Sequence, residues 1–173
     1  FEGRVERATI KRLLTHTAGL PLHYQFFYAG GPPVPTMDEA ISRYGIVVYP
    51  PGERFFYSNF GYGVLERILE RAGGRPYADV LRDVVLRPLG LHATTVSDGA
   101  RLGGGRAAIR YGTDGNPIRP YTFDHVAASG VWSSARDLAR FGLFHLGQDA
   151  DRGEAVLSRR TRRRMQERHA SAD

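Results

Sequence analysis

The sequence contains no cysteine among its 173 residues, which excludes disulfide bonds, thiol nucleophiles and cysteine-ligated metal ions. It also contains no apolar run near the roughly 18 residues that indicate a membrane-spanning helix. Residues Phe1 to Arg4 do not begin the charged and then apolar pattern of a signal peptide. We therefore predict no membrane span, and the sequence leaves the cellular compartment undetermined.

Lysine is nearly absent as well, because only Lys11 is a lysine among the 24 basic residues. The formal net charge of +6 is unevenly distributed along the chain. Residues 158–173 contain six arginines, Glu167 and Asp173, so this segment carries +4 and the other 157 residues carry only +2. The positive charge is thus concentrated in one terminal segment.

This arginine-rich segment contains no aromatic residue between Arg159 and Arg168. Sites for nucleic acids usually combine basic charge with a groove or with aromatic side chains on which bases stack. We therefore expect a solvated helix face, or a face that docks on an acidic segment of the same polypeptide outside this chain, and no nucleic acid partner. Polyanion binding through Arg159–Arg164 is the less favoured alternative.

Caps and apolar spacing predict a helix-rich structure without repeats or long linkers. Thr36 and Glu39 form a capping box, Ser58 is expected to cap a long helix that Gly73-Gly74 ends, and weaker signals favour a hairpin near Asp114-Gly115. The predicted helices cover residues 9–15, 36–44, 58–72, 76–86, 133–147 and a last segment from 158. Apolar stripes fall on Val64, Leu65, Ile68, Leu69 and Ala72, on Tyr77, Val80, Leu81, Val84 and Val85, and on Leu138, Phe141 and Leu146.

The most informative segment is Tyr57-Ser58-Asn59, which lies between a Pro-Pro-Gly turn and the long amphipathic helix. A tyrosine and an asparagine two positions apart at such a junction can present a phenol and a carboxamide to one cleft. Free backbone N–H groups at a helix start would favour an anionic phenolate by about 0.3–1 kcal/mol. Because this is too little to bring a phenol with a pKa near 10 to neutrality, a tyrosine base would also need nearby cations.

Four segments carry a resemblance to a known family. The middle one, PPGERFFYSNFGYGVLERILERAGGRPY, covers residues 50–77. The others are ATIKRLLTHTAGLP at 8–21, LRPLGLHATT at 86–95 and AASGVWSSARDLARF at 127–141. In order and spacing they resemble the serine β-lactamase and penicillin-binding-protein superfamily, most closely its class C type, and together they span most of the chain.

The resemblance implies a fold that is mainly α with minor β, the helical subdomain of the serine β-lactamase/transpeptidase-like α+β fold with an incomplete sheet. It implies a serine hydrolase that forms an acyl-enzyme, with a β-lactam, a D-amino-acid peptide or an ester as the substrate. Tyr57 resembles the general base that helps to activate the serine, and Asn59 resembles the residue that holds an amide group of the substrate. No cofactor or metal is implied, and a periplasmic or secreted location is compatible with the family.

Two other motifs of the family are missing. The Ser-x-x-Lys motif supplies the nucleophile, but Lys11 follows Ala8 where that motif has its serine. His145-Leu146-Gly147 matches a His-x-Gly strand only in its letters, because it lies in a predicted helix. We therefore expect no nucleophile in this chain. Residues 1–173 are expected to form a single partial domain, an internal piece of a longer hydrolase that is inactive alone and is completed by missing segments of the same polypeptide.

Other interpretations stay open at this stage. The chain could belong to a non-catalytic relative, or to an isolated domain, that binds a peptide or acyl ligand without turnover. Ser129, Ser133 and Ser134 are better explained as helix caps than as nucleophiles, because no Gly-x-Ser-x-Gly or Ser-x-x-Lys surrounds them. The six histidines are scattered without a His-Glu-x-x-His, which argues against a metal site, and His16 is expected to cap or to pack.

Overall fold

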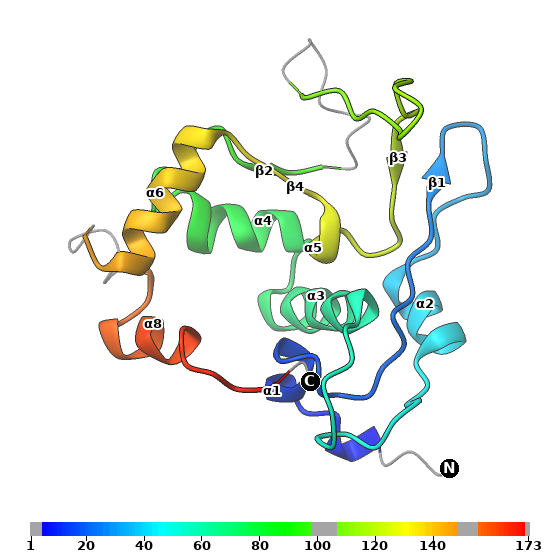
Figure 1. The fold of residues 1–173 in the computed structure, drawn as a ribbon, viewed down its shortest axis with the longest axis horizontal. Coiled ribbons are helices and arrows are strands. Elements are labelled where there is room, and N and C mark those ends of the chain that lie inside the picture. Colours follow the sequence, from blue (N-terminus) through cyan, green and yellow to red (C-terminus); the bar gives the residue numbers. More distant parts are fainter. Residues whose placement is uncertain (1–4, 98–106, 149–155, 172–173) are drawn as a thin grey trace.

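The computed structural model describes residues 5–97, 107–148 and 156–171. Within these ranges, shorter elements surround one long helix (Figure 1), and no helix is long and apolar enough to cross a membrane. The helices are a 3₁₀ turn Val5–Arg7, α1 Ile10–Leu14, α2 Met37–Tyr44, α3 Asn59–Gly73, α4 Tyr77–Leu81, a π-helical turn Arg82–Leu86, α5 Val126–Ser129, α6 Ala135–Leu146 and α8 Arg159–Met165. The strands are β1 Phe27–Tyr28, β2 Thr95–Val96, β3 Tyr121–Thr122 and β4 Val131–Trp132. The predicted class, mainly α with minor β, is confirmed.

Helix α3 is the element around which the others pack. It contacts α1, α2, α4 and α5, and Figure 1 shows α1 below it and α4 above it. The hydroxyl of Ser58 caps its start by accepting a hydrogen bond from the N–H of Gly61 at 2.8 Å. Gly74 ends it in the left-handed conformation, with φ of 64°. Both ends follow the prediction, since they depend on local cap chemistry.

The starts of α2 and α6 also follow local signals, whereas Thr9 at the start of α1 makes no side-chain cap hydrogen bond. In α2, the Thr36 side chain and the Glu39 side chain each bond the other residue's backbone N–H, which confirms the capping box. Ser134 caps α6 by accepting a hydrogen bond from the N–H of Asp137 at 3.2 Å. His145 lies inside α6, so the His-x-Gly lettering is helical, as expected.

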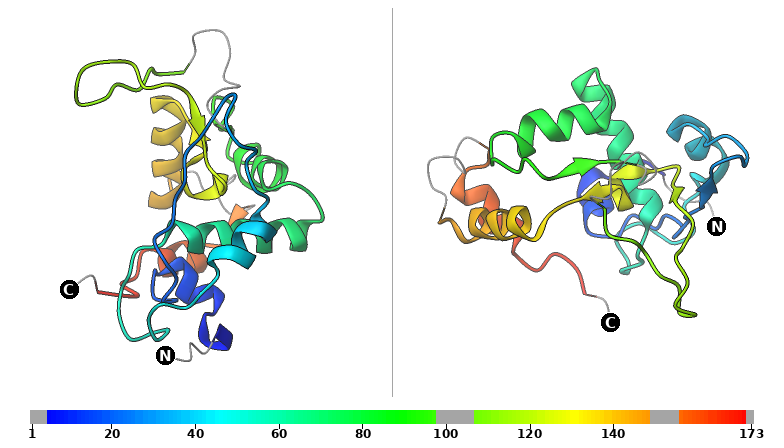
Figure 2. Two further views of the ribbon diagram at one scale, coloured as in Figure 1. Left: turned by 90° about the vertical axis from the view of Figure 1, so that its right-hand side faces the viewer. Right: turned by 90° about the horizontal axis from the view of Figure 1, so that it is seen from above.

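Two small antiparallel sheets lie in the described ranges. In one, β1 pairs with β3, with Phe27 opposite Thr122. In the other, β2 pairs with β4, with Thr95 opposite Trp132. A single bridge between Tyr111 and Pro117 forms the hairpin predicted around Gly115, and Figure 2 shows this segment projecting away from the helices.

The core consists of two clusters of buried apolar side chains. The first joins α1, the loop after it, α2 and α3 through Leu13, Ala18, Leu20, Met37, Ala40 and Phe60. The second lies under α6 and consists of Leu86, Leu89, Leu91 and Phe144. The start of α3 belongs to the first cluster, so its position is fixed by packing as well as by its cap.

The predicted apolar stripes are only partly buried. Leu69 and Val84 are exposed, whereas Glu66 on α3 is buried. On α3 this pattern arises because α2 and the segment at residue 125 pack against the helix at Gly63. A Cβ atom added to Gly63 would lie 2.7 Å from the Cβ of His125, so this close approach requires glycine. Helix α6 likewise exposes Leu138 and Leu146, which its apolar spacing placed on the stripe.

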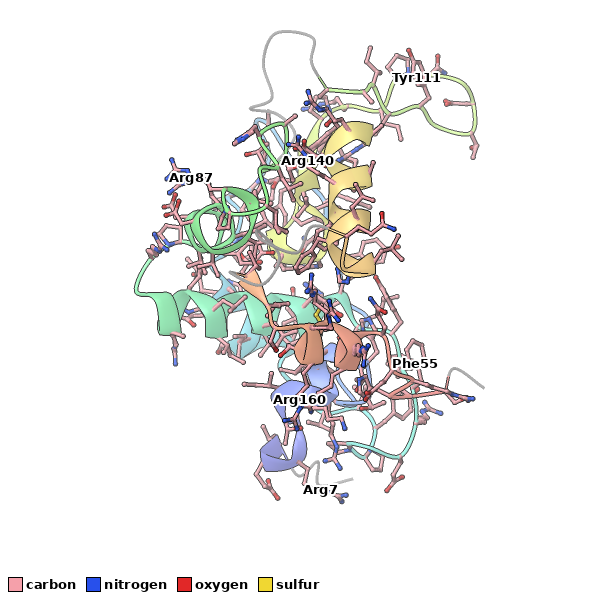
Figure 3. All side chains as sticks on the ribbon, turned by 90° about the vertical axis from the view of Figure 1, so that its left-hand side faces the viewer. Arg7, Phe55, Arg87, Tyr111, Arg140 and Arg160 are labelled. Atoms are coloured by element: carbon pink, nitrogen blue, oxygen red, sulfur yellow. The ribbon has the colours of Figure 1, made fainter. Side chains whose placement is uncertain are left out.

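Four arginines of α8 line one hollow together with Glu167, namely Arg159, Arg160, Arg163 and Arg164. Other arginines of the described residues lie on other segments, and Figure 3 labels Arg7, Arg87 and Arg140 among them. In α8, Arg162 is only 3% exposed. Its guanidinium donates to the carbonyl of Phe144 at 3.0 Å and stacks 5.2 Å from the centroid of that ring. The prediction of a solvated face is therefore wrong for Arg162 and holds for the exposed Arg159, Arg160, Arg163 and Arg164.

Replacing Arg162 by alanine should lower the free energy of unfolding by about 2 kcal/mol, because the Phe144 carbonyl loses a charged donor and the ring loses its stacking partner. The matched variant Arg163→Ala removes an exposed arginine from the same helix and should leave stability nearly unchanged. Urea denaturation monitored by circular dichroism measures both. Equal losses in the two variants would contradict a buried structural role for Arg162.

Candidate functional site at the start of helix α3

The start of α3 is held by the loop that follows α1. Ser58 is 4% exposed, and its hydroxyl donates to the carbonyl of Pro21 at 2.6 Å while it accepts from the helix. The carbonyl of Leu22 accepts from the N–H of Asn59 at 3.1 Å and from that of the next residue at 3.4 Å. This loop and the helix start therefore form one hydrogen-bonded unit.

These bonds correct one expectation. Free N–H groups were expected at the start of α3, where they would favour an anion, but the N–H groups of Asn59, Phe60 and Gly61 are all bonded within the chain. The loop carbonyls at residues 21 and 22 need donors too, and the helix start provides them. These bonded N–H groups are therefore not free to stabilise an anion at this end of α3.

Tyr57 and Asn59 lie on either side of the cap residue. Tyr57 is 51% exposed, so its phenol is not enclosed in an apolar interior, and Asn59 is half-buried as the first residue of α3. The structure thus places both side chains at a well-anchored junction. That they line one shared cavity stays a prediction.

The sole lysine lies in the wall of a neighbouring cavity. This polar cavity has a volume of about 570 Å³, and its described lining includes Lys11, Arg12, Arg54 and Phe55 but not Tyr57. Phe55 is separated from Tyr57 by one residue, so the cavity lies beside the candidate site. Its cations come from α1 and from the turn that precedes the site.

A buried polar cluster, which sequence reasoning missed, connects this loop to the second half of the chain. Asp124 accepts a hydrogen bond from Nε2 of His23 at 2.7 Å and another from Nδ1 of His125 at 2.5 Å. Burial alone would raise the pKa of Asp124, but the hydrogen bonds from His125 and His23 outweigh it and hold this pKa below its usual value. The cluster therefore contains a carboxylate that two imidazoles stabilise.

The same three residues are of the types that bind metal ions. Their donor atoms lie within 4.8 Å of one another, a proximity of His23 and His125 that the scattered histidines and the missing His-Glu-x-x-His did not indicate. Each carboxylate oxygen of Asp124 already accepts a bond from one ring, however, while Nε2 of His125 is buried and has no hydrogen-bond partner among the described residues. The adjacent Asp124-His125 pair, before a run of small residues, was the available sequence signal.

Glu66 is a second buried acid, on the face of α3 that meets α5. It is 8% exposed, and one of its carboxylate oxygens accepts from the N–H of Ala127 at 2.8 Å. Burial raises the pKa of Glu66 from 4.5 to about 7, although the Ala127 hydrogen bond opposes the shift. The carboxyl group thus holds the start of α5 at the cost of placing a titratable group in the interior.

The raised pKa of Glu66 predicts a pH-dependent stability. Because the folded-state pKa of about 7 lies above the ordinary value of 4.5, the stabilisation is complete below pH 4.5 and is lost as the pH rises through 7. The free energy of unfolding should fall by up to roughly 3 kcal/mol over this range. Denaturation series at several pH values should show this slope in the natural chain and lose it in Glu66→Gln. The exposed control Glu53→Gln should retain it, and a slope that persists in Glu66→Gln would assign it elsewhere.

Comparison with known proteins gives a consistent result along the chain. Residues 1–173 match the family model described as Beta-lactamase. Penicillin-binding protein 4* of Bacillus subtilis (strain 168) is 35% identical over 115 residues, covering 56% of this chain and 25% of that protein. Penicillin-binding protein 4 of Amycolatopsis lactamdurans is 31% identical over 166 residues, covering 87% of this chain and 41% of that protein. The chain therefore spans less than half the length of these relatives.

Solved structures agree with this result. The octameric penicillin-binding protein homologue from Pyrococcus abyssi superimposes with a TM-score of 0.69 and 28% sequence identity. The superposition covers 92% of this chain and 38% of that one. Since the family model matches the chain from its first residue to its last, the protein belongs to the Beta-lactamase family.

Proposed function

We propose that this chain provides the tyrosine and asparagine half of the active site of a serine hydrolase that forms an acyl-enzyme. The observation that carries the proposal is the Tyr57-Ser58-Asn59 junction, in which a buried serine anchors a half-exposed phenol at the start of α3. The Beta-lactamase family match along the whole chain supports the reaction class. The relatives named as penicillin-binding proteins support a substrate with a reactive acyl group.

The two side chains have different roles in this proposal. Tyr57, as the phenolate, takes the proton from the serine hydroxyl during acylation, and the resulting phenol gives this proton to the leaving group, which regenerates the phenolate. The Asn59 carboxamide, which can both donate and accept hydrogen bonds, holds an amide group of the substrate. The substrate is a β-lactam, a D-amino-acid peptide or an ester.

We propose further that residues 1–173 are one part of a larger catalytic domain. The part is its helical subdomain with an incomplete sheet, and segments outside this chain supply the nucleophilic serine, its lysine and the last strand. Two observations support this view. The chain has no Ser-x-x-Lys, and it spans 41% of the length of the Amycolatopsis lactamdurans relative. The coding sequence on either side of this segment tests the idea directly.

The 173-residue chain alone should form no covalent adduct with a fluorescent penicillin or a fluorophosphonate probe. The reason is that Ser134 serves as a helix cap and the hydroxyl of Ser133 bonds that of Thr94 at 2.8 Å, with no lysine at the spacing that activates a serine. Gel fluorescence and intact mass measure the outcome, with a serine β-lactamase as the positive control. Stoichiometric labelling of one serine in this chain would show that it carries its own nucleophile.

In the polypeptide that contains the nucleophile, Tyr57→Phe should lower turnover by roughly 10²–10⁴-fold, the usual contribution of a general acid or base. Phenylalanine keeps the ring and removes only the hydroxyl, so folding should be unchanged. Tyr111→Phe is the matched control, because Tyr111 is an exposed tyrosine on the hairpin. Hydrolysis of a chromogenic cephalosporin and of a simple ester measures both variants. Wild-type turnover in Tyr57→Phe would return Tyr57 to a packing role.

A further inference from the structure

His16 accepts hydrogen bonds from the backbone N–H groups on both sides of Tyr57, one at its carbonyl and one at its ring. The N–H of Phe56, just before Tyr57, donates to the carbonyl of His16 at 2.7 Å. The N–H of Ser58, just after it, donates to Nδ1 of the His16 ring at 3.2 Å. One residue thus fixes the backbone on both sides of the tyrosine, although the two are 41 positions apart in the sequence.

The ring of His16 also packs directly on the ring of Tyr57. The two centroids are 4.4 Å apart with an interplanar angle of 36°. The ring of Tyr62, from α3, lies 5.1 Å away, and its hydroxyl is fixed by a bond to the carbonyl of Leu14 at 3.1 Å. The imidazole therefore contacts both tyrosine rings, and its contact restricts the half-exposed ring of Tyr57.

The backbone at His16 would normally favour another residue. The N–H of His16 bonds the carbonyl of Leu13 and the N–H of Thr17 bonds that of Arg12, which is the Schellman motif that ends α1. His16 occupies the left-handed position of this motif, with φ of 54°. That position usually holds glycine or asparagine, because a Cβ atom is unfavourable there. A histidine in this conformation indicates that its ring has a role which glycine could not perform.

We propose that His16, acting through the hydrogen bond from Ser58 to its neutral ring, is the residue that positions the Tyr57 phenol for proton transfer. The proposal rests on the acyl-transfer function proposed above. His16 does not contact the reacting atoms. It positions the ring and backbone of Tyr57, which does contact them. A displacement of a catalytic group by about 1 Å can lower the rate about a hundredfold.

The hydrogen bond requires one protonation state. Nδ1 can accept the Ser58 N–H only when it carries no proton, so the ring must be neutral with its proton on Nε2. Burial lowers the pKa of His16, which favours this state. The titratable groups packed on the ring are the phenols of Tyr57 and Tyr62, and Lys11 and Arg12 of α1 face the adjoining polar cavity. Protonation of His16 in acid should therefore release Tyr57.

The first experiment tests this geometry in the 173-residue chain, without reference to activity. The ring signals of Tyr57, assigned by their loss in Tyr57→Phe, should titrate in ¹H–¹³C spectra as the pH falls below 6.5, the ordinary pKa of histidine, because burial lowers the pKa of His16. His16→Asn should abolish the titration, and the control His92→Asn, at an exposed histidine, should leave it intact. Tyr57 signals that are independent of pH, or unchanged in His16→Asn, would overturn the proposal.

The second experiment tests the consequence for catalysis in the polypeptide that contains the nucleophile. His16→Ala should lower kcat by about 10- to 100-fold with little change in KM, because orientation and not substrate binding is lost. His16→Asn should recover most of kcat, since asparagine tolerates the left-handed backbone and its Oδ1 occupies the place of Nδ1. The recovered variant should also lack the loss of kcat in acid that protonation of His16 causes.

The outcomes separate the two proposals. If Tyr57→Phe retains turnover, the proposed function fails, while the spectra of the isolated chain still decide whether His16 holds Tyr57. If Tyr57→Phe loses turnover and His16→Ala does not, the function stands and the positioning role is overturned. A His16→Asn variant that folds, by circular dichroism, but turns over no faster than His16→Ala would also overturn it.

Discussion

The hydroxyl of Ser58 is the contact on which the arrangement of the candidate site depends. It donates to the carbonyl of Pro21 and accepts from the N–H of Gly61, so one buried oxygen joins the loop after α1 to the start of α3. Without it, a carbonyl and an N–H would be left in the interior with no partner, which is more costly than the loss of an exposed bond. Tyr57 and Asn59 take their positions from this junction because they are its immediate neighbours.

A second support reaches the same loop from the other half of the chain. His23 directly follows the two residues that bond the start of α3, and its ring is tied to Asp124 in the interior. Asp124 also holds His125, which packs against α3 at Gly63, and Glu66 on α3 holds the N–H of Ala127. Segments about a hundred residues apart are thus joined through buried polar groups. Because a buried polar group costs free energy when it lacks a hydrogen bond, these bonds favour a single arrangement of the loop.

The geometry and the family match support the same assignment from different directions. The match of residues 1–173 places the chain in the Beta-lactamase family, while the structure shows a phenol that is exposed, anchored and packed on the imidazole of His16. The chemistry still requires a nucleophile and cations beside the phenol. Our proposal assigns these to segments outside this chain, and it makes the start of α3 one wall of a site that those segments complete.

Local chemistry explains why much of the fold could be predicted. The capping box of Thr36 and Glu39, the cap at Ser58 and the glycine that ends α3 all involve residues within a few positions of each other. Tyr57 and Asn59 could be identified as candidates from the order and spacing of four motifs. Their proximity to Ser58 also follows from the sequence, because covalent neighbours of a helix cap must lie at the helix start.

Apolar periodicity was a poorer guide, because it shows that a helix has an apolar side and not which side its neighbours cover. Leu69 is exposed and Glu66 is buried since α5 and α2 pack where Gly63 leaves room. Arg162 is buried although its helix is rich in arginine, because α8 packs on α6, where Phe144 offers its carbonyl and its ring to the guanidinium. The sequence by itself determined the caps of α2, α3 and α6, the family and the candidate pair. Only the tertiary structure decided that His16 packs on Tyr57 and that His23 meets Asp124, because contacts between distant segments depend on how the helices pack and have no local signature.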